Sequence, residues 1–375
     1  MFFQVSKKYE ILLGAFVHRT NRGQAAGGVR FWKYDNIESY FRDGLRLAAG
    51  MTFKNALAGL WWGGGKGVIL HNPIYEWNDP EVRKNIYKEY GFFISSLKGC
   101  YVTAEDLGTS EEDMVDVFSG TRFTTCIPSE LGGSGVPAIP TARGVVCGME
   151  AAADFLKLGL LEGKTVAMQG LGHVGIPLAG FLFEKGVRKI ISCDVNPDNV
   201  KEAKEKYEGR NIECRLVDID DTSIFSEECD IFSPNATGAI LNHETIDKIR
   251  AKIICGAANN QLEDPERDGD LLVKKGITYV PDFLTNRMGI VNCANEQYGY
   301  VNNDSMIEQH FSKDWEYSIY NTAIKVLKES KSLNKPTAKI ALKIADELSK
   351  VNHPIFGHRG KEIIKSLVDN EWHLN

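Results

Sequence analysis

The feature that most constrains the fold of this chain is a glycine-spaced turn at residues 170–175. The run reads Gly170-Leu171-Gly172-His173-Val174-Gly175. An apolar segment typical of a buried strand, 165–169, comes before it, and apolar residues at helical spacing follow over 174–185. A second strand is expected at 189–193 and is followed by Asp194, 19 positions after Gly175. A GxGxxG in this context indicates a dinucleotide-binding turn.

Each position of the turn has a physical reason. Gly170 permits the tight turn, Gly172 lets the backbone approach a pyrophosphate, and Gly175 lets the helix pack closely on the strand. The helix begins at His173 and Val174, where free N–H groups and a partial positive charge favour phosphates. The alternative is a glycine-rich turn in a sheet that binds no nucleotide.

The acid after the second strand bears on which dinucleotide is bound. Asp194 is placed to accept hydrogen bonds from the ribose hydroxyls, and its negative charge would repel a 2′-phosphate. We therefore expect NAD rather than NADP as the cofactor.

The length of the chain and a loop-rich passage predict two domains. A chain of 375 residues is too long for one ordinary core. Glycine and proline are concentrated over 126–142, which places the boundary there. Behind it a helix is expected at 141–158, and then strands at 165–169, 189–193, 212–216, 231–233, 253–255 and 278–280 that alternate with helices. This rhythm predicts an α/β domain at 141–330, a Rossmann-type, doubly wound parallel sheet.

The first domain, 1–132, mixes strands and helices. Strands are expected at 9–17, 28–32, 68–70 and 101–104, and helices from 37 to 51 and at 81–97. Two long amphipathic helices, 303–331 and 336–350, are expected near the C-terminus.

Composition argues against several classes of partner. The net charge of −6 lacks the basic character of a nucleic-acid binder, and no run approaches the roughly 18 apolar residues of a membrane helix. The N-terminus has no long apolar signal segment, and the eight cysteines are scattered without a CxxC pair. We therefore expect a cytoplasmic protein with buried free thiols, no metal site, and no nucleic-acid or membrane partner.

A second glycine cluster, Gly63-Gly64-Gly65-Lys66-Gly67, is not a P-loop, because that motif needs glycine at 60 and serine or threonine at 67. We interpret it as a loop that presses a small substrate against Lys66. Lys54 lies twelve residues upstream, and two lysines at one pocket lower each other's pKa, so that one becomes a general base while the other holds a carboxylate. Asp106, just after the strand 101–104, supplies an acid.

Two alternatives stay open at this point. The first is that both lysines are solvated surface charges without a catalytic role. The second is that Glu105–Asp106 caps a helix at 110–118. The residues alone indicate a nicotinamide-dependent oxidoreductase without naming its substrate.

Nearly the whole chain resembles the glutamate/leucine/phenylalanine/valine dehydrogenase superfamily, and most closely its leucine dehydrogenases. The motifs that carry the resemblance are, in order, 27–30 (GGVR), 50–56 (GMTFKNA), 63–66 (GGGK), 103–109 (TAEDLGT), 140–145 (PTARGV), 170–175, 256–262 (GAANNQL), 291–292 (VN) and 295–296 (NE). Their number and order argue strongly against chance agreement.

The resemblance implies a fold and a set of roles. The N-terminal domain, 1–132 with helices returning at about 331–375, would bind the substrate and make oligomer contacts, so a homo-oligomer is expected. Lys66 would be the catalytic lysine that activates water, Asp106 would transfer protons, and Lys54 would bind the α-carboxylate of an L-amino acid.

The remaining site residues also follow from the resemblance. The substrate would further meet Ala26, Gly27, Gly28, Ala104, Asn260, Ile290 and Cys293. The cofactor would meet Thr141, which holds the nicotinamide carboxamide, together with Asn259, Asn286, Gly170, Gly172, His173, Val174, Gly175 and Asp194.

Two pocket positions bear on the substrate side chain. Glutamate dehydrogenases carry a lysine immediately before the Gly-Gly pair and a serine at the position of Cys293, whereas this chain has Ala26 before the pair. A γ-carboxylate would therefore be buried without a partner, which costs several kcal/mol. Leucine dehydrogenases typically carry Leu and Val at these positions, so the smaller groups here indicate a deeper pocket.

The expected function is the reversible, NAD-dependent oxidative deamination of an apolar, branched-chain L-amino acid to its 2-oxo acid and ammonia. The alternatives are an aromatic amino-acid dehydrogenase of the same family and a non-catalytic NAD-binding homologue. The second is kept open because Asn286-Arg287-Met288-Gly289 replaces the usual Asn-Ala-Gly-Gly and would place two bulky side chains near the nicotinamide. The N-terminal helix common in the family is missing, which leaves the subunit number open.

Overall fold

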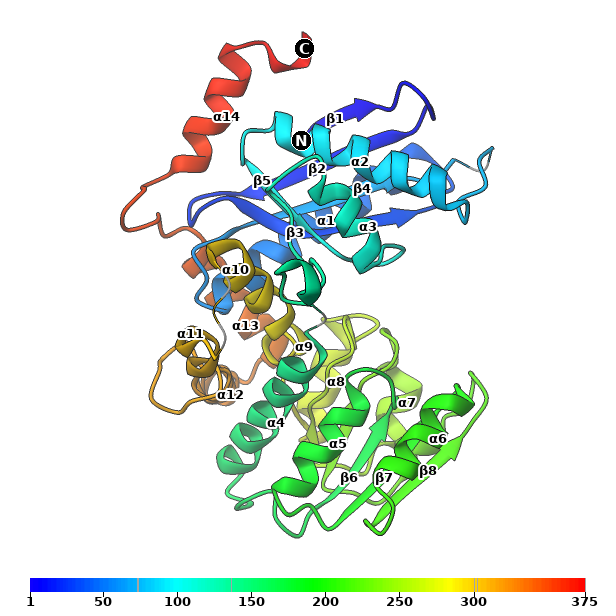
Figure 1. Cartoon of the computed structure of the whole chain (residues 1–375). Helices are drawn as coiled ribbons and strands as arrows, with labels where there is room; N and C mark the ends of the chain where they lie inside the picture. Colours follow the sequence, from blue (N-terminus) through cyan, green and yellow to red (C-terminus); the bar gives the residue numbers. More distant parts are fainter. Residues whose placement is uncertain (73, 136, 300, 302, 375) are drawn as a thin grey trace. The chain divides into compact units, whose positions relative to one another are not determined.

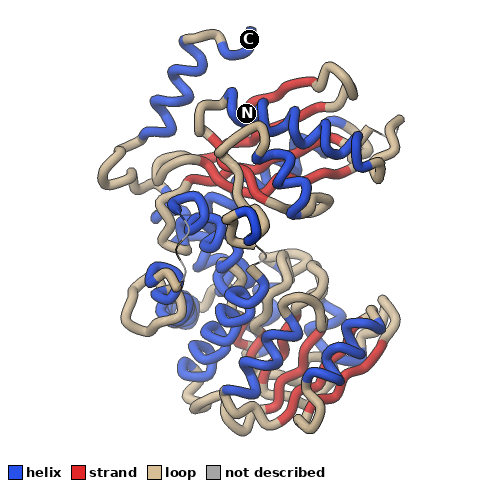
Figure 2. Tube along the Cα trace, in the orientation of Figure 1, coloured by secondary structure: helices blue, strands red, loops and turns tan. Residues whose placement is uncertain are grey.

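The structure, a computed structural model, describes residues 1–72, 74–135, 137–299, 301 and 303–374. The chain divides into two α/β units, and the expected fold class is confirmed (Figures 1 and 2). Unit 1 comprises Met1–Val136, Ile290–Asp304 and Ile344–Asn375, and unit 2 comprises Pro137–Gly289 and Ser305–Lys343. The sequence-based division differs from this one, because it placed the return to the first domain at about 331 and had no segment returning at 290–304.

Unit 1 is built on a five-stranded sheet in the order β1-β2-β4-β3-β5. The strands are β1 (Phe2–Val5), β2 (Leu12–Arg19), β3 (Ala25–Trp32), β4 (Gly63–Leu70) and β5 (Tyr101–Ala104). β2 is antiparallel to β1 and β4, while β3 is parallel to β4 and β5. Within this parallel part Gly28 of β3 pairs with Ala104, the last residue of β5.

Two helices cover opposite faces of this sheet, α1 (Ile37–Leu57) and α2 (Pro80–Ser96). A Cβ on Gly64 would meet Thr52 of α1, whereas a Cβ on Gly67 would meet the hydroxyl of Tyr90 of α2. Residues an odd number apart on a strand point to opposite faces, so the two helices lie on different sides of β4. α3 (Glu111–Phe118) lies against α2.

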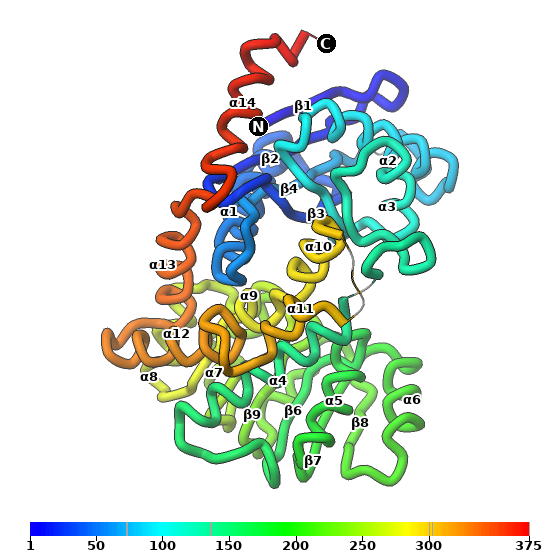
Figure 3. Tube along the Cα trace, turned by 60° about the vertical axis from the view of Figure 1, so that its left-hand side comes forward, coloured from blue at the N-terminus to red at the C-terminus, as the bar shows by residue number. Residues whose placement is uncertain are grey.

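The C-terminal part of unit 1 contains α10 (Met288–Gly299), α13 (Thr337–Ser349) and α14 (Arg359–Asp369). α10 and α13 each begin in unit 2 and continue in unit 1. α14 follows α13 toward the C-terminus (Figure 3), and Trp372 just beyond α14 packs edge-on against Phe2 of β1 with ring centroids 5.3 Å apart. β1 was not predicted from the sequence, whereas α14 falls within the range of about 331–375 where the resemblance implied returning helices.

Unit 2 contains a six-stranded, wholly parallel sheet in the order β11-β10-β9-β6-β7-β8. The strands are β6 (Thr165–Gln169), β7 (Lys189–Asp194), β8 (Ile212–Leu216), β9 (Ile231–Pro234), β10 (Ile253–Ile254) and β11 (Thr278–Tyr279). This is the strand order of the doubly wound dinucleotide-binding fold, and the direction of winding reverses between β6 and β9. All six strands were predicted, with ends that differ by one residue at most.

Helices cover both faces of this sheet. α5 (Gly175–Glu184) and α6 (Pro197–Lys206) lie in front of it in Figure 1, and α7 (His243–Lys248) and α8 (Arg267–Lys275) lie behind. Two separate apolar clusters match this arrangement, one under α5 and α6 and the other under α7 and α8. The other helices of the unit are α4 (Ala138–Phe155), α9 (Asp282–Thr285), α11 (Ser305–Gln309) and α12 (Ile319–Leu333).

The single helix predicted at 303–331 is wrong. The structure has α11 and α12 there, separated by residues 310–318. Ser318 caps α12 by accepting the N–H of Asn321 at 3.1 Å, and Arg287 binds both His310 and the carbonyl of Tyr317. The apolar spacing of the sequence did not reveal the break, and the contacts that Arg287 makes there join positions 23 and 30 residues apart.

The loop predicted at Gly63–Gly67 is also wrong, because these residues form the first half of β4. A Cβ on Gly64 would lie 2.0 Å from Thr52 Oγ1, and one on Gly65 would lie 2.6 Å from the ring of Tyr101. The glycines therefore permit close packing on both faces of a central strand. Among the described residues, no helix combines the length and apolar character needed to cross a membrane.

We expect Gly64→Ala to destabilise the protein by about 3 kcal/mol, because α1 must move away from β4 to make room for the methyl group. The control is Gly50→Ala on α1, where a Cβ meets no atom within 4 Å. That change should be neutral or stabilise by up to about 1 kcal/mol. Thermal and urea unfolding of the two variants measure the difference, and equal stabilities would contradict the packing argument.

Candidate active site

The predicted acid and one of the two predicted lysines meet in unit 1. Lys66 Nζ lies 2.8 Å from Asp106 Oδ2, and the lysine side chain is only 4% exposed. This low exposure contradicts the alternative in which Lys66 is a solvated surface charge. The cap of α3 is Ser110, so the second alternative, in which Glu105–Asp106 caps that helix, is also wrong.

The local chain explains why these two groups meet. Lys66 lies two residues after Gly64 on β4, so its side chain leaves the strand on the face covered by α1. Asp106 follows the end of β5 in a tight turn, in which its N–H donates to Thr109 Oγ1 at 2.8 Å. A Cβ on Gly28 would lie 2.7 Å from Asp106 Cβ. The glycine on β3 therefore leaves the space that the aspartate occupies.

A second cation also holds the aspartate. Arg30 Nε lies 3.1 Å from Asp106 Oδ2, and Arg30 Nη1 lies 2.9 Å from Asp43 Oδ2 on α1. The Tyr34 hydroxyl donates to the same Asp43 oxygen at 2.7 Å. Sequence reasoning gave Arg30 and Asp43 no role, although Arg30 stands in one of the motifs that carry the family resemblance.

The electrostatics of the pair follow from burial and charge. Burial lowers the pKa of the Lys66 ammonium, although Asp106 opposes that shift. Burial alone would raise the pKa of Asp106, but Lys66 and Arg30 outweigh it and the pKa lies below its usual value. Asp106 is therefore an anion at neutral pH, and Lys66 loses its proton more easily than an exposed lysine does.

The other expected substrate residues divide between the units. Lys54 is half-buried in the last turn of α1. The small residues at 26–28 lie on β3, and Ala104 ends β5 beside them. Ile290 and Cys293 are buried one turn apart on α10. Asn260 lies in unit 2, where it is exposed and has a positive φ of 52°.

The glycine-spaced turn of unit 2 has the geometry its spacing predicts. Gly170 has a φ of +99°, and a Cβ on Gly175 would lie 2.2 Å from the Gly170 carbonyl oxygen. A Cβ on Gly172 would have its nearest neighbour, Asn199 Nδ2, 4.0 Å away, so the backbone here borders open space. A side chain at 172 would fill the place that a pyrophosphate needs. The residues present therefore fit a dinucleotide.

The acid of this site is close to the turn. Asp194 Oδ2 accepts the N–H of Leu171 at 2.6 Å, and its Oδ1 accepts the N–H of Asn196 at 2.8 Å. A Cβ on Gly170 would lie 3.0 Å from Ala236, so the segments after β6 and β9 meet beside the turn. This is the point where the strand order reverses, which is where ligands bind in open α/β sheets.

Three further expected cofactor residues also lie in unit 2. Asn286 is buried and donates from Nδ2 to Asn259 Oδ1 at 2.7 Å and to the Ala257 carbonyl at 3.0 Å. Thr141 is buried in the first turns of α4. The structure thus connects Asn286 with Asn259, while Thr141 stands on a separate element.

The two bulky residues after Asn286, which the sequence led us to expect near a nicotinamide, have their side chains inside the protein. Arg287 and Met288 are both fully buried. Arg287 donates to the Tyr317 carbonyl and lies 3.2 Å from His310 Nδ1. Burial lowers the pKa of Arg287 to about 9, and burial together with this neighbouring cation lowers the pKa of His310 to about 2. The replacement therefore anchors the segment between α11 and α12.

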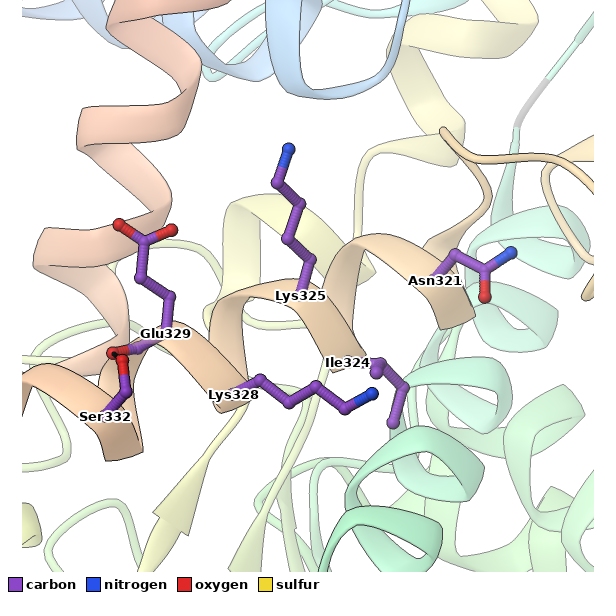
Figure 4. A pocket seen from close by; sticks show the side chains of 6 residues that line it. All are labelled: Asn321, Ile324, Lys325, Lys328, Glu329 and Ser332. Carbon is purple, nitrogen blue, oxygen red and sulfur yellow. Dashed lines mark hydrogen bonds between the residues drawn. The ribbon is translucent and has the colours of Figure 1, made fainter.

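One hollow on unit 2 contains none of the expected site residues. Its lining comes wholly from α12, namely Asn321, Ile324, Lys325, Lys328, Glu329 and Ser332 (Figure 4). Lys325 and Glu329 point the same way from the helix, and Glu329 is paired with Lys343 at 3.0 Å. We regard it as an open, solvated face. Among the described residues, no three His, Cys, Asp or Glu side chains are grouped to hold a metal ion.

A dinucleotide-type turn in one unit and a buried lysine–aspartate pair in the other define an oxidoreductase of the dehydrogenase class. The model of the Glu/Leu/Phe/Val dehydrogenase dimerisation domain matches residues 6–122, and the Glutamate/Leucine/Phenylalanine/Valine dehydrogenase model matches residues 132–352. The chain belongs to this family and is an amino-acid dehydrogenase.

The relatives of this chain are named as dehydrogenases of different amino acids. A leucine dehydrogenase of Geobacillus stearothermophilus is 41% identical over 88% of this chain and 85% of its own length. A phenylalanine dehydrogenase of Lysinibacillus sphaericus is 39% identical over 76% and 72%. The crystal structure of L-tryptophan dehydrogenase from Nostoc punctiforme covers 93% of this chain and 94% of its own, with 34% identity and a TM-score of 0.77.

We expect Asp106→Asn to cost about 3 kcal/mol of folding free energy at pH 7, because it removes the carboxylate that compensates the buried Lys66 ammonium. The variant lowers the Lys66 pKa further in the folded state, while the unfolded value stays near 10.4. The unfolded chain then binds more protons, so the stability of the variant rises with pH relative to wild type until Lys66 is neutral in both states. Urea unfolding at pH 7 and 9.5 measures this recovery.

Asp113→Asn is the matched control, since Asp113 is paired with Arg83, which keeps its proton over this range. Its loss of stability should be the same at both pH values. An Asp106→Asn deficit that is equally constant would show that Lys66 is not the group that titrates.

Proposed function

We propose that this chain catalyses the reversible, NAD-dependent oxidative deamination of an apolar L-amino acid to its 2-oxo acid, with release of ammonia and consumption of water. The observation that carries the proposal is the buried contact of 2.8 Å between Lys66 and Asp106. The 41% identity to a leucine dehydrogenase over most of the chain supports a branched-chain substrate.

The cofactor assignment rests on the turn at 170–175 and on Asp194. Gly170, Gly172 and Gly175 would hold the pyrophosphate with the first N–H groups of α5, including those of His173 and Val174. Asp194 would bind the adenosine ribose and disfavour NADP by charge, and Thr141, Asn259 and Asn286 would serve the nicotinamide end. The chemistry that NAD supplies when bound is the acceptance of a hydride.

Lys66 is the group suited to act as a base. Once deprotonated, it takes a proton from the water molecule that attacks the imino acid, and its lowered pKa makes that form accessible at moderately alkaline pH. Asp106 at 2.8 Å receives and returns protons as the carbinolamine loses ammonia. Lys54 would hold the substrate α-carboxylate by its positive charge. Arg30 keeps Asp106 in place and anionic.

The substrate side chain would meet an uncharged pocket. In unit 1, Ala26, Gly27, Gly28 and Ala104 come from β3 and β5, while Ile290 and Cys293 come from α10. The family resemblance also assigns Asn260 of unit 2 to the substrate. No cation stands among these residues for a γ-carboxylate, so glutamate is disfavoured. Similarity to L-tryptophan and phenylalanine dehydrogenases favours an aromatic substrate as the second candidate.

Assembly and compartment belong to the same proposal. A dimerisation-domain model matches residues 6–122, which supports a homo-oligomer. All eight cysteines are free in the structure, in accord with a reducing, cytoplasmic compartment.

The direct test of the function is NADH formation, followed at 340 nm at alkaline pH, with a panel of L-amino acids. We expect leucine, isoleucine and valine to give kcat/KM at least 100-fold above glutamate, because the cost of an unpaired buried carboxylate exceeds 2.7 kcal/mol. Phenylalanine or tryptophan as the best substrate would establish the second candidate. The absence of turnover with the whole panel would favour an NAD-binding homologue without catalysis.

Lys66→Ala should lower kcat at least 1,000-fold, which is within the range of a lost general base, while NADH binding followed by fluorescence stays within twofold. Asp194→Ala should instead weaken NADH binding about tenfold or more, because it removes charged hydrogen bonds. Lys88→Ala, at an exposed lysine of α2, is the control for a lost surface charge. Retained turnover in Lys66→Ala would remove the lysine from the mechanism.

A further inference from the structure

Two buried cysteines from distant parts of the sequence touch each other in unit 1. Cys126 Sγ and Cys293 Sγ are 3.4 Å apart, and the two residues are 6% and 5% exposed. The sequence separates them by 167 positions. All eight cysteines lie among the described residues, and all are free. The sequence did not predict this contact, because neither cysteine belongs to a CxxC motif.

The two thiols are held together by more than their own contact. Cys126 has a φ of +66°, a left-handed conformation that is costly for a side chain other than glycine. Its N–H donates to Glu296 Oε2 at 3.0 Å, and the Ser134 hydroxyl donates to the same oxygen at 2.6 Å. Glu296 stands on α10 one turn after Cys293. The same helix therefore fixes both the backbone of Cys126 and its partner thiol.

The chemistry of the pair is asymmetric. The hydrogen bond from Cys126 lowers the pKa of Cys293, and the same bond together with burial raises the pKa of Cys126 well above its ordinary value. Burial raises the pKa of Cys100, Cys147, Cys193, Cys229 and Cys255. Because the thiolate is the reactive form, Cys293 is the favoured nucleophile of the pair, and Cys126 is placed to resolve the product.

We propose that Cys126 and Cys293 form an oxidisable dithiol that closes to a disulfide in the presence of a peroxide and thereby switches off turnover. Closure shortens the contact of 3.4 Å by about 1.4 Å, since a disulfide bond is about 2.05 Å long. The bond would join α10 to the segment 126–134, which α10 already holds through Glu296 and through Asn292, whose Nδ2 donates to the Ser134 carbonyl at 3.2 Å.

The step balances with hydrogen peroxide as the oxidant. The Cys293 thiolate attacks one peroxide oxygen, the O–O bond breaks, and after protonation the products are Cys293 sulfenic acid and one water molecule. The Cys126 sulfur then attacks the sulfenic sulfur, the S–OH bond breaks, and a second water molecule leaves with the Cys126 proton. Two thiols lose two electrons and two protons, and one peroxide is reduced to two water molecules.

The effect on turnover rests on the proposed function, in which Cys293 lines the substrate pocket. Drawing its sulfur toward Cys126 changes the shape of that pocket and restrains α10. The formation of the disulfide does not depend on the substrate, so failure of the proposed function and failure of this inference give different results.

The test treats the full-length protein with hydrogen peroxide, quenches with a thiol-blocking reagent in denaturant, and maps disulfides by peptide mass. We expect one disulfide, Cys126–Cys293, and a fall in free thiols from eight to six. Turnover should fall at least tenfold and return with dithiothreitol. Any other disulfide as the main product, or oxidation without one, overturns the proposal.

Cys126→Ser is the informative variant, because it removes the resolving thiol and leaves Cys293 in the pocket. Its oxidation should stop at the Cys293 sulfenic or sulfinic acid, with no disulfide at that cysteine, so that dithiothreitol restores turnover less completely than in wild type. Cys147→Ser, a buried thiol of unit 2, should stay as sensitive as wild type. Disulfide formation with unchanged turnover overturns the regulatory role, and the map on wild-type protein decides the disulfide itself even where a variant folds poorly.

Discussion

The structure of unit 1 depends on holding a lysine ammonium inside the protein, because a buried cation without a partner costs several kcal/mol. Asp106 supplies the compensating charge at 2.8 Å, and Arg30 and Asp43 extend the contact into a chain of alternating charges that ends on α1. Glycines at two nearby positions make room for these charged side chains. Gly28 leaves space for the aspartate, and Gly64 lets α1 approach the strand that bears Lys66.

Unit 2 differs from unit 1 in that its characteristic feature is a turn of exposed backbone suited to an anion. The glycines of this turn leave open space at Gly172 and close contact at Gly175. The carboxylate of Asp194 accepts the N–H of Leu171 in this turn and the N–H of Asn196 after β7, and so ties the two segments together. Unit 1 therefore holds a buried pair of titrating groups, and unit 2 holds a turn whose backbone leaves room for an anion.

The sequence predicted the second unit better than the first for a physical reason. The strands of a parallel sheet are buried on both faces, so each appears as an apolar run bounded by turns, and all six were located. The first part of β4, Gly63–Gly67, was taken for a loop because its packing uses glycines, which carry no apolar signal. Three other features were missed because they depend on contacts between residues far apart in the sequence, which local patterns do not reveal. They are the role of Arg30, the break between α11 and α12, and the contact of Cys126 with Cys293.

The choice of substrate depends on two energetic effects of different size. A charge that lacks a partner in a buried pocket costs several kcal/mol, whereas one methylene group more or less is worth about 1–3 kcal/mol. Ala26 and Cys293 carry no charge, so a pocket lined by them, as proposed above, would disfavour an acidic side chain by the larger effect. Discrimination among leucine, phenylalanine and tryptophan draws on the smaller effect, which a few side-chain volumes suffice to change. That is why relatives at 34–41% identity to one chain act on such different apolar amino acids.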